Sequence, residues 1–175
     1  MRLRLITSFA CSLFLAMTAA AQQGGAAASP PETAHVTLAS GSITVKYAAP
    51  SMRGRKIVGS LVPYDKVWRT GANEATVFAT NTALKIGGTT VPAGTYTLYT
   101  LPGESQWMLI VNKQTGQWGT VYNEPQDLAR IPMKSAKLPS PQEQMSITFE
   151  NTSGNSTEMH IKWENSDESV AITAQ

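Results

Sequence analysis

Apolar and polar residues alternate with a period of two in segments 43–47, 145–150 and 159–164. This spacing puts the apolar side chains on one face of an extended strand and the polar side chains on the other. We therefore predict a half-buried strand at each of the three segments. Residues 107–111 are apolar at every position, which is typical of a central strand, and we expect this strand to pair with residues 95–101.

Turn-forming residues recur at short intervals between the predicted strands. They are Ser40-Gly41, Gly87-Gly88, Pro92-Ala93-Gly94, Pro102-Gly103, Thr115-Gly116, Gly154-Asn155 and Asn165-Ser166-Asp167. Short strands separated by regular turns indicate an all-β fold, and an antiparallel β-sandwich of about nine strands is expected.

Two long stretches do not alternate, and long loops on a β scaffold often carry function. The first runs from Ala48 to Ala75, and within it residues 63–70 are predicted to form one or two short helical turns that end before Gly71. The second runs from Gly116 to Leu128.

The N-terminus has the pattern of a secretory signal peptide. Arg2 and Arg4 precede an apolar run that ends in small residues, so we expect a signal peptide over residues 1–21 with cleavage before Gln22. Residues 22–33 are predicted to be a flexible leader, and residues 34–175 a single domain. The sequence thus predicts an exported protein, periplasmic or extracellular, whose mature chain has no membrane span.

Composition excludes several classes of protein. Removal of the predicted signal peptide leaves twelve basic and twelve acidic residues, so a nucleic-acid partner is not expected. The only cysteine, Cys11, would be removed as well, which excludes disulfides and thiolate chemistry in the mature chain. Metal-ligand spacings are not found in the sequence, and we expect neither a metal nor another cofactor.

A cluster of basic residues marks the first irregular stretch, at Arg53, Arg55, Lys56, Lys66 and Arg69. The planar guanidinium group of arginine suits a carboxylate or phosphate ligand. A structural alternative is that Arg69 pairs with Glu74 inside the protein and holds the loop to the sheet.

Four tryptophans divide into two pairs. Trp107 and Trp163 lie on predicted strands and are expected in the core. Trp68 and Trp118 lie in the irregular stretches, where they could form a platform for a planar ligand or plug an open end of the sandwich.

Catalytic groups are sparse. Neither His35 nor His160 has an evident serine or acid partner in the sequence. A two-carboxylate hydrolase would require a second acid next to Glu74.

Five segments of the chain resemble an exported bacterial family, domain-of-unknown-function family 2911. They are Gly54-Arg-Lys-Ile57, Leu61-Val-Pro-Tyr64, Val67-Trp-Arg-Thr-Gly-Ala-Asn-Glu-Ala-Thr76, Pro92-Ala-Gly-Thr-Tyr96 and Gln117-Trp-Gly119, and the resemblance extends from Val36 to Ile172. It implies a bacterial envelope or secreted protein and supplies no activity. Positions typical of this family fall at Arg53, Lys56, Trp68, Arg69, Asn73, Glu74, Asp127 and Arg130.

Together these patterns favour a non-catalytic module that binds a polar or anionic small molecule. The expected ligand-binding residues are Arg53, Lys56, Trp68, Arg69, Asn73, Glu74 and Trp118. The alternatives are a hydrolase that uses Glu74 and an envelope protein with a structural or interaction role.

Overall fold

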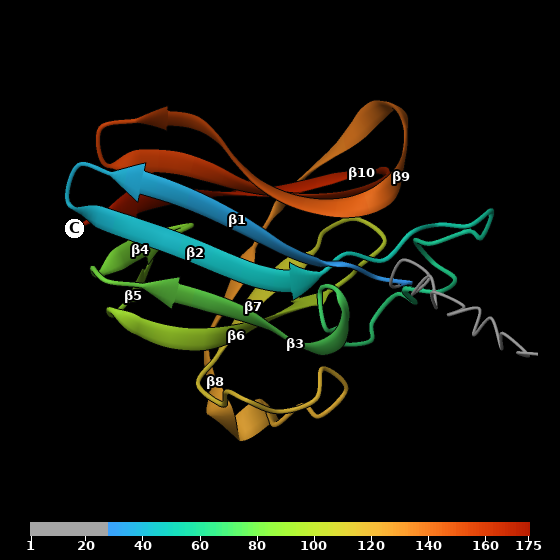
Figure 1. Cartoon of the computed structure of the whole chain (residues 1–175), viewed down its shortest axis with the longest axis horizontal. Coiled ribbons are helices and arrows are strands. Elements are labelled where there is room, and N and C mark those ends of the chain that lie inside the picture. Colours follow the sequence, from blue (N-terminus) through green and yellow to red (C-terminus); the bar gives the residue numbers. More distant parts are fainter. Residues whose placement is uncertain (1–27) are drawn as a thin grey trace, which may run out of the picture.

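The computed structural model describes residues 28–175, so the predicted signal peptide and residues 22–27 of the predicted leader lie outside it. Ten strands form two antiparallel sheets that pack face to face, which confirms the all-β sandwich (Figure 1). The strands are β1 (Pro31–Leu38), β2 (Gly41–Ala48), β3 (Ala72–Thr80), β4 (Leu84–Ile86), β5 (Thr89–Val91), β6 (Gly94–Leu101), β7 (Met108–Asn112), β8 (Asp127–Pro132), β9 (Lys134–Ser153) and β10 (Ser156–Ala174).

The larger sheet has six strands in the order β1-β2-β3-β6-β7-β8, and the smaller has four in the order β5-β4-β10-β9. The predicted pairing of residues 95–101 with 107–111 is confirmed, since β6 pairs antiparallel with β7. β7 lies between β6 and β8, and its residues 109–112 are all buried. Because Leu109, Ile110 and Val111 are fully buried, both faces of β7 are covered, as its unbroken apolar sequence indicates.

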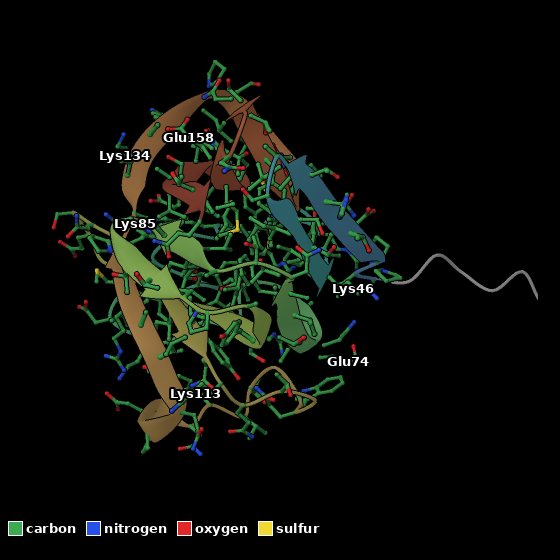
Figure 2. All side chains as sticks on the ribbon, turned by 90° about the vertical axis from the view of Figure 1, so that its left-hand side faces the viewer. Lys46, Glu74, Lys85, Lys113, Lys134 and Glu158 are labelled. Atoms are coloured by element: carbon green, nitrogen blue, oxygen red, sulfur yellow. The ribbon has the colours of Figure 1, made fainter. Side chains whose placement is uncertain are left out.

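Side chains from both sheets fill the space between them (Figure 2). The three alternating segments have the predicted phase, because Ile43, Met145, Met159, Ile161 and Trp163 are all buried. Their alternate neighbours remain more exposed, as expected for strands with one face toward solvent.

The hairpin of β9 and β10 is longer than the alternation indicates, with strands of 20 and 19 residues. Its regular pairing breaks on both sides of Glu164. Lys162 pairs with Ser146, Glu164 with Gln142, and Ser166 with Lys137, so β9 has extra residues at both steps. Pro139 and Pro141 lie on β9 within this interruption. Proline has no N–H group to donate to the hydrogen-bond ladder of a sheet. It is therefore tolerated on an edge strand or at a bulge, and β9 provides both.

Three local predictions differ from the structure. The described chain has ten strands, against about nine expected. The predicted helical turns at residues 63–70 are wrong, because Asp65 has a φ of 57° and Trp68 pairs as an extended residue with Thr100. The helical turn in the described chain is a 3-10 helix in the other irregular stretch, at Glu124–Gln126. Finally, β1 begins at Pro31, three residues before the expected start of the domain at Ala34.

A cluster of three tryptophans closes one end of the core. The ring of Trp68 stacks on that of Trp163 with centroids 5.7 Å apart and meets the edge of Trp107 at 6.4 Å. The indole N–H of Trp163 donates to the carbonyl oxygen of Glu143 at 3.1 Å. Trp68 therefore packs against the core, although its sequence position is in a loop.

We predict that Trp163→Ala lowers the free energy of unfolding by about 3–5 kcal/mol, because it removes a buried aromatic side chain and the stacking partner of Trp68. Trp118→Ala is the matched control, since half of Trp118 is exposed, and it should change the free energy by no more than about 0.5 kcal/mol. Urea denaturation measures both, and similar losses in the two variants would contradict the assignment of Trp163 to the core.

Candidate functional site

The string from Arg69 to Glu74 forms a sharp bend at the start of β3. Thr70 and Asn73 have φ values of 53° and 57°, in the left-handed region that costs energy for residues other than glycine. The bend is held from inside the protein, because the Thr76 hydroxyl donates to the Thr70 carbonyl at 2.9 Å and Thr70 Oγ1 to Thr100 Oγ1 at 3.2 Å. The turn chemistry thus fixes the backbone from which Arg69 and Asn73 project.

The loop around Trp118 is joined to this bend through the backbone. Gly119 N donates to Asn73 O at 3.0 Å, Ala75 N donates to Gln117 O at 3.3 Å, and Glu74 pairs with Trp118 in an isolated antiparallel bridge. The two irregular stretches predicted from the sequence therefore meet at one end of the sandwich.

Gly119 is required for this close approach. A Cβ atom at this position would lie 2.7 Å from Arg69 Cδ and 2.7 Å from the carbonyl oxygen of Asn73, closer than real contacts allow. A glycine here lets the Arg69 side chain lie directly over the second loop.

A polar cluster at the base of the second loop ties it to the larger sheet. The Asp127 carboxylate accepts hydrogen bonds from Tyr122 at 2.5 Å, Arg130 at 2.8 Å and the buried Asn112 amide at 2.8 Å, and Arg130 also pairs with Glu124 at 2.7 Å. Burial, and then the hydrogen bond to Asp127, raise the pKa of Tyr122 to about 12. Tyr122 therefore stays neutral and keeps its proton donated to Asp127.

A hollow of about 470 Å³ lies where the two loops meet. Its basic lining residues are Arg55, Lys66 and Arg69, and neither aspartate nor glutamate is among the described residues that line it. Aromatic walls come from Trp68, Tyr99, Tyr122 and Trp163, and polar groups from Asn73 and Thr120. We call this the cationic hollow.

The structure gathers some of the predicted site residues and leaves others outside. Trp68, Arg69 and Asn73 line the cationic hollow. Arg53, Lys56, Glu74 and Trp118 do not. Arg55 and Lys66 line the hollow in addition to Arg69. Both belong to the basic cluster identified in the sequence but were not among the expected ligand-binding residues.

Arg53 has a structural role. Its guanidinium donates to the carbonyl oxygen of Ala28 at 2.9 Å and its backbone N–H donates to the Glu143 carboxylate at 2.8 Å. The exposed Glu74 side chain lies at the surface, at the start of β3 (Figure 2). Within residues 28–175 it forms no ion pair with Arg69, so the internal pair considered from the sequence is not formed.

The guanidinium of Arg69 is only partly used by the protein. Its Nε donates to Gly71 O at 3.3 Å, while its two Nη groups donate to no acceptor in the described part of the chain. Arg69 is half-buried and lines the cationic hollow, so unused donors are held beside an open volume.

Exposed large apolar side chains occur in the same two loops. They are Leu61, Trp118 and Val121, each close to half exposed. Leu61 lines the cationic hollow, and Trp118 and Val121 flank the lining residues Gly119 and Thr120 in the chain. The cationic hollow therefore has an apolar border as well as a charged interior.

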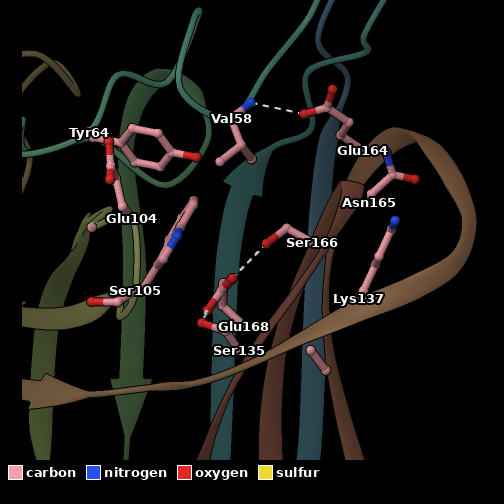
Figure 3. Close-up of a pocket in the computed structure, with 13 residues that line it drawn as sticks. Val58, Tyr64, Glu104, Ser105, Ser135, Lys137, Glu164, Asn165, Ser166 and Glu168 are labelled. Atoms are coloured by element: carbon pink, nitrogen blue, oxygen red, sulfur yellow. Dashed lines mark hydrogen bonds between the residues drawn. The ribbon is translucent and has the colours of Figure 1, made fainter.

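A second hollow, of about 530 Å³, was not indicated by the sequence (Figure 3). Among residues 28–175, three carboxyl groups line it, those of Glu104, Glu164 and Glu168, together with the single cation Lys137, and Tyr64 and Trp107 form its aromatic walls. Glu168 is 2% exposed and accepts hydrogen bonds from the hydroxyls of Ser135 and Ser166. Burial raises the pKa of its carboxyl group. We call this the acidic hollow.

The comparison with protein families bears on the whole domain. The family described as protein of unknown function (DUF2911) matches residues 29–172. The chain belongs to this family. Comparison with curated proteins and with solved structures gave no match. The resemblance stated from the loop motifs is confirmed, and family membership itself supplies no activity.

His160 has an acid partner that the sequence did not reveal. It lies on the outer face of β10, where its Nδ1 is 2.8 Å from Asp167 Oδ1 and its Nε2 is 3.8 Å from both Glu150 and Glu158. Lys162 contacts the same Glu150 and lowers the pKa of that carboxyl group. No serine hydroxyl is bonded to the His160 ring in the described chain, and the cluster is a partly buried polar network.

Residues 28–175 contain neither a cluster of metal-ligating side chains nor a helix that could cross a membrane. No set of three or more histidine, cysteine, aspartate or glutamate side chains could hold a metal ion. None of the helical segments in these residues has the length and apolar character to cross a membrane.

We predict that Gly119→Ala lowers the free energy of unfolding by about 1–3 kcal/mol, because the added methyl group must push Arg69 or the Asn73 backbone away. Thr120→Ala, at the exposed neighbouring residue, is the control and should have little effect. Both are measured by chemical denaturation. Equal stability of the two variants would show that the loops can separate without cost.

We also predict a pH dependence of stability from Glu168. Because its pKa is raised in the folded state, the folded chain binds the proton more tightly than the unfolded chain does. The resulting stabilisation is complete below the ordinary value of 4.5 and is lost as the pH rises through the folded pKa. As the pH rises above 4.5, wild type should therefore lose stability relative to Glu168→Gln, which has no titrating group at this position. Melting temperatures at several pH values measure this. A difference in melting temperature between the two proteins that stays constant with pH would contradict the prediction.

Proposed function

We propose that this protein is an exported bacterial binding module, without catalytic activity, for a small anionic ligand that carries a ring or another apolar body. The observation that carries the proposal is the cationic hollow, where Arg55, Lys66 and Arg69 line one volume and no described carboxylate does. Export is supported by the signal-peptide pattern of residues 1–21 and by the resemblance to an exported family.

Electrostatics favour an anion in this hollow. Cations that are not neutralised by nearby acids create a local positive potential, and low-dielectric aromatic walls strengthen it. Arg69 offers two unused Nη groups, and a guanidinium binds a carboxylate or phosphate through paired hydrogen bonds. Asn73 adds an amide that both donates and accepts.

The rest of the ligand is constrained by the apolar parts of the same volume. Trp68 and Tyr122, both half-buried, present aromatic surface inside the hollow, and Leu61 presents an exposed side chain at its border. An inorganic anion would leave these surfaces unused. A ligand with an apolar body would cover them and gain free energy from their removal from water.

The two alternatives from the sequence have less support. A hydrolase built on Glu74 would need this carboxylate in a cleft, whereas Glu74 is exposed and lines neither hollow. A purely structural role for the Arg69 bend would be favoured by a buried pair with Glu74, and that pair is not formed within residues 28–175.

We expect phenyl phosphate to bind the protein, as measured by calorimetry, and to bind more tightly than inorganic phosphate or phenol. Arg69→Gln should weaken binding by about 10- to 100-fold, because a charge-assisted hydrogen bond contributes about 1.5–3 kcal/mol. The matched control is Lys113→Gln at an exposed lysine outside the hollow, and it should bind like wild type.

The stability of Arg69→Gln distinguishes a binding role of Arg69 from a structural role. Arg69→Gln should unfold at nearly the same urea concentration as wild type, because its one hydrogen bond within the described chain is a long bond to Gly71. The proposal would be contradicted if phenyl phosphate did not bind to wild type, or if wild type and Arg69→Gln bound it equally.

A further inference from the structure

The acidic hollow is a second volume, separate from the cationic hollow. Segment 51–71 forms part of both, because it contributes Val58 and Tyr64 to the acidic hollow and Lys66 and Arg69, among others, to the cationic one. The tryptophan cluster also borders both volumes, with Trp107 in the acidic hollow and Trp68 and Trp163 in the cationic hollow. A ligand of the acidic hollow would therefore be distinct from the anion proposed for the cationic hollow.

Charge in the acidic hollow is strongly unbalanced. Three glutamates line it and Lys137 is its single lining cation among the described residues. Lys137 forms no ion pair with any of these carboxyl groups within residues 28–175. The negative potential in the hollow is thus not cancelled by the protein itself.

Glu168 is the group that most needs a partner. It is the only aspartate or glutamate among the buried residues of the described chain, and neither lysine, arginine nor histidine pairs with it there. The hydroxyls of Ser135 and Ser166 each donate to one of its oxygens but bring no charge (Figure 3). Buried carboxylates usually have a cationic partner, because the cost of desolvation is otherwise uncompensated.

The walls of the hollow are fixed by hydrogen bonds across three segments. The Glu164 carboxylate accepts the N–H groups of Ile57 and Val58, at 3.3 and 2.9 Å, which ties segment 51–71 to β10 (Figure 3). Ser135, which binds Glu168, is also the cross-strand partner of that residue on β9. Glu168 is therefore held in a fixed position, and a ligand would not need to order it.

Aromatic side chains complete the site. Tyr64 and Trp107 both line the hollow, and aromatic faces attract organic cations as well as apolar groups. A hydrated metal ion would gain little from such walls, and no metal-binding set of side chains occurs in the described chain. Neutral polar molecules would leave the excess negative charge uncompensated.

We propose that the acidic hollow binds a small organic amine, with its ammonium group beside Glu168 and Glu104 and its carbon body against Tyr64 and Trp107. The ammonium group supplies the cation that the protein lacks at Glu168. Its carbon body replaces water at the aromatic walls.

The first test compares three probes of the same size on the full protein by calorimetry. Benzylamine carries a positive charge, benzyl alcohol is neutral, and benzoate is negative. Benzylamine should bind at least tenfold more tightly than benzyl alcohol, and an excess of benzoate should not displace benzylamine, since the anion is excluded from the acidic hollow. No benzylamine binding at millimolar concentration, or equal binding of benzyl alcohol, would overturn the proposal.

The second test uses variants that remove one charge each. Glu168→Gln keeps the shape of the side chain and should weaken benzylamine binding at least tenfold, and Glu104→Gln, at an exposed residue that does not endanger folding, should weaken it severalfold. The control Glu32→Gln, at an exposed residue on β1 outside the hollow, should leave binding unchanged. Unchanged benzylamine affinity in Glu104→Gln and in any folded Glu168→Gln would overturn the proposal.

Arg69→Gln separates this proposal from the one for the cationic hollow. This variant should bind phenyl phosphate more weakly than wild type does and should bind benzylamine with the wild-type affinity. If Arg69→Gln lowers the affinity for benzylamine as much as it lowers the affinity for phenyl phosphate, the amine occupies the cationic hollow. The assignment to the acidic hollow is then wrong.

Discussion

The stacking of Trp68 on Trp163 fixes the position of segment 51–71, which contains no named strand. Trp163 comes from β10 in the smaller sheet, while the backbone of Trp68 exchanges two hydrogen bonds, of 2.8 and 2.9 Å, with Thr100 of β6 in the larger sheet. One residue therefore joins the loop to both layers. Since segment 51–71 provides walls for both hollows, their shapes depend on this contact. Burial of the two large rings offsets the entropy lost when a long loop is ordered.

The bend after Trp68 is a second constraint, and it acts through strain. Two residues other than glycine, Thr70 and Asn73, adopt left-handed conformations there, each of which costs on the order of 1 kcal/mol. The cost is offset by the buried hydrogen bond from Thr76 to the Thr70 carbonyl and by the backbone contact with Gly119. A relaxed chain could continue β3 smoothly. The strained chain instead turns the Arg69 side chain over Gly119, where it lines the cationic hollow.

The sequence predicted what depends on local pattern and missed what depends on register. The sandwich and the buried face of β10 follow from period-two alternation, and Arg69 and Asn73 stood out because they lie close together in one string. Glu168 could not be recognised in this way, because Ser135 becomes its neighbour only through the pairing of β9 with β10. The helical prediction at 63–70 failed for a related reason, since contact with distant Thr100 outweighed a weak local preference.

The equal numbers of basic and acidic residues after position 21 conceal a spatial separation of charge. In the described part of the chain, cations without acids line one hollow, and three carboxyl groups with one lysine line the other. The tryptophan cluster borders both. Charges interact more strongly through such an apolar medium than through water. If both hollows are occupied as proposed, an anion in the first and an amine in the second attract each other across this cluster. Each ligand would then increase the affinity for the other by the same factor, since coupling between two binding sites is reciprocal.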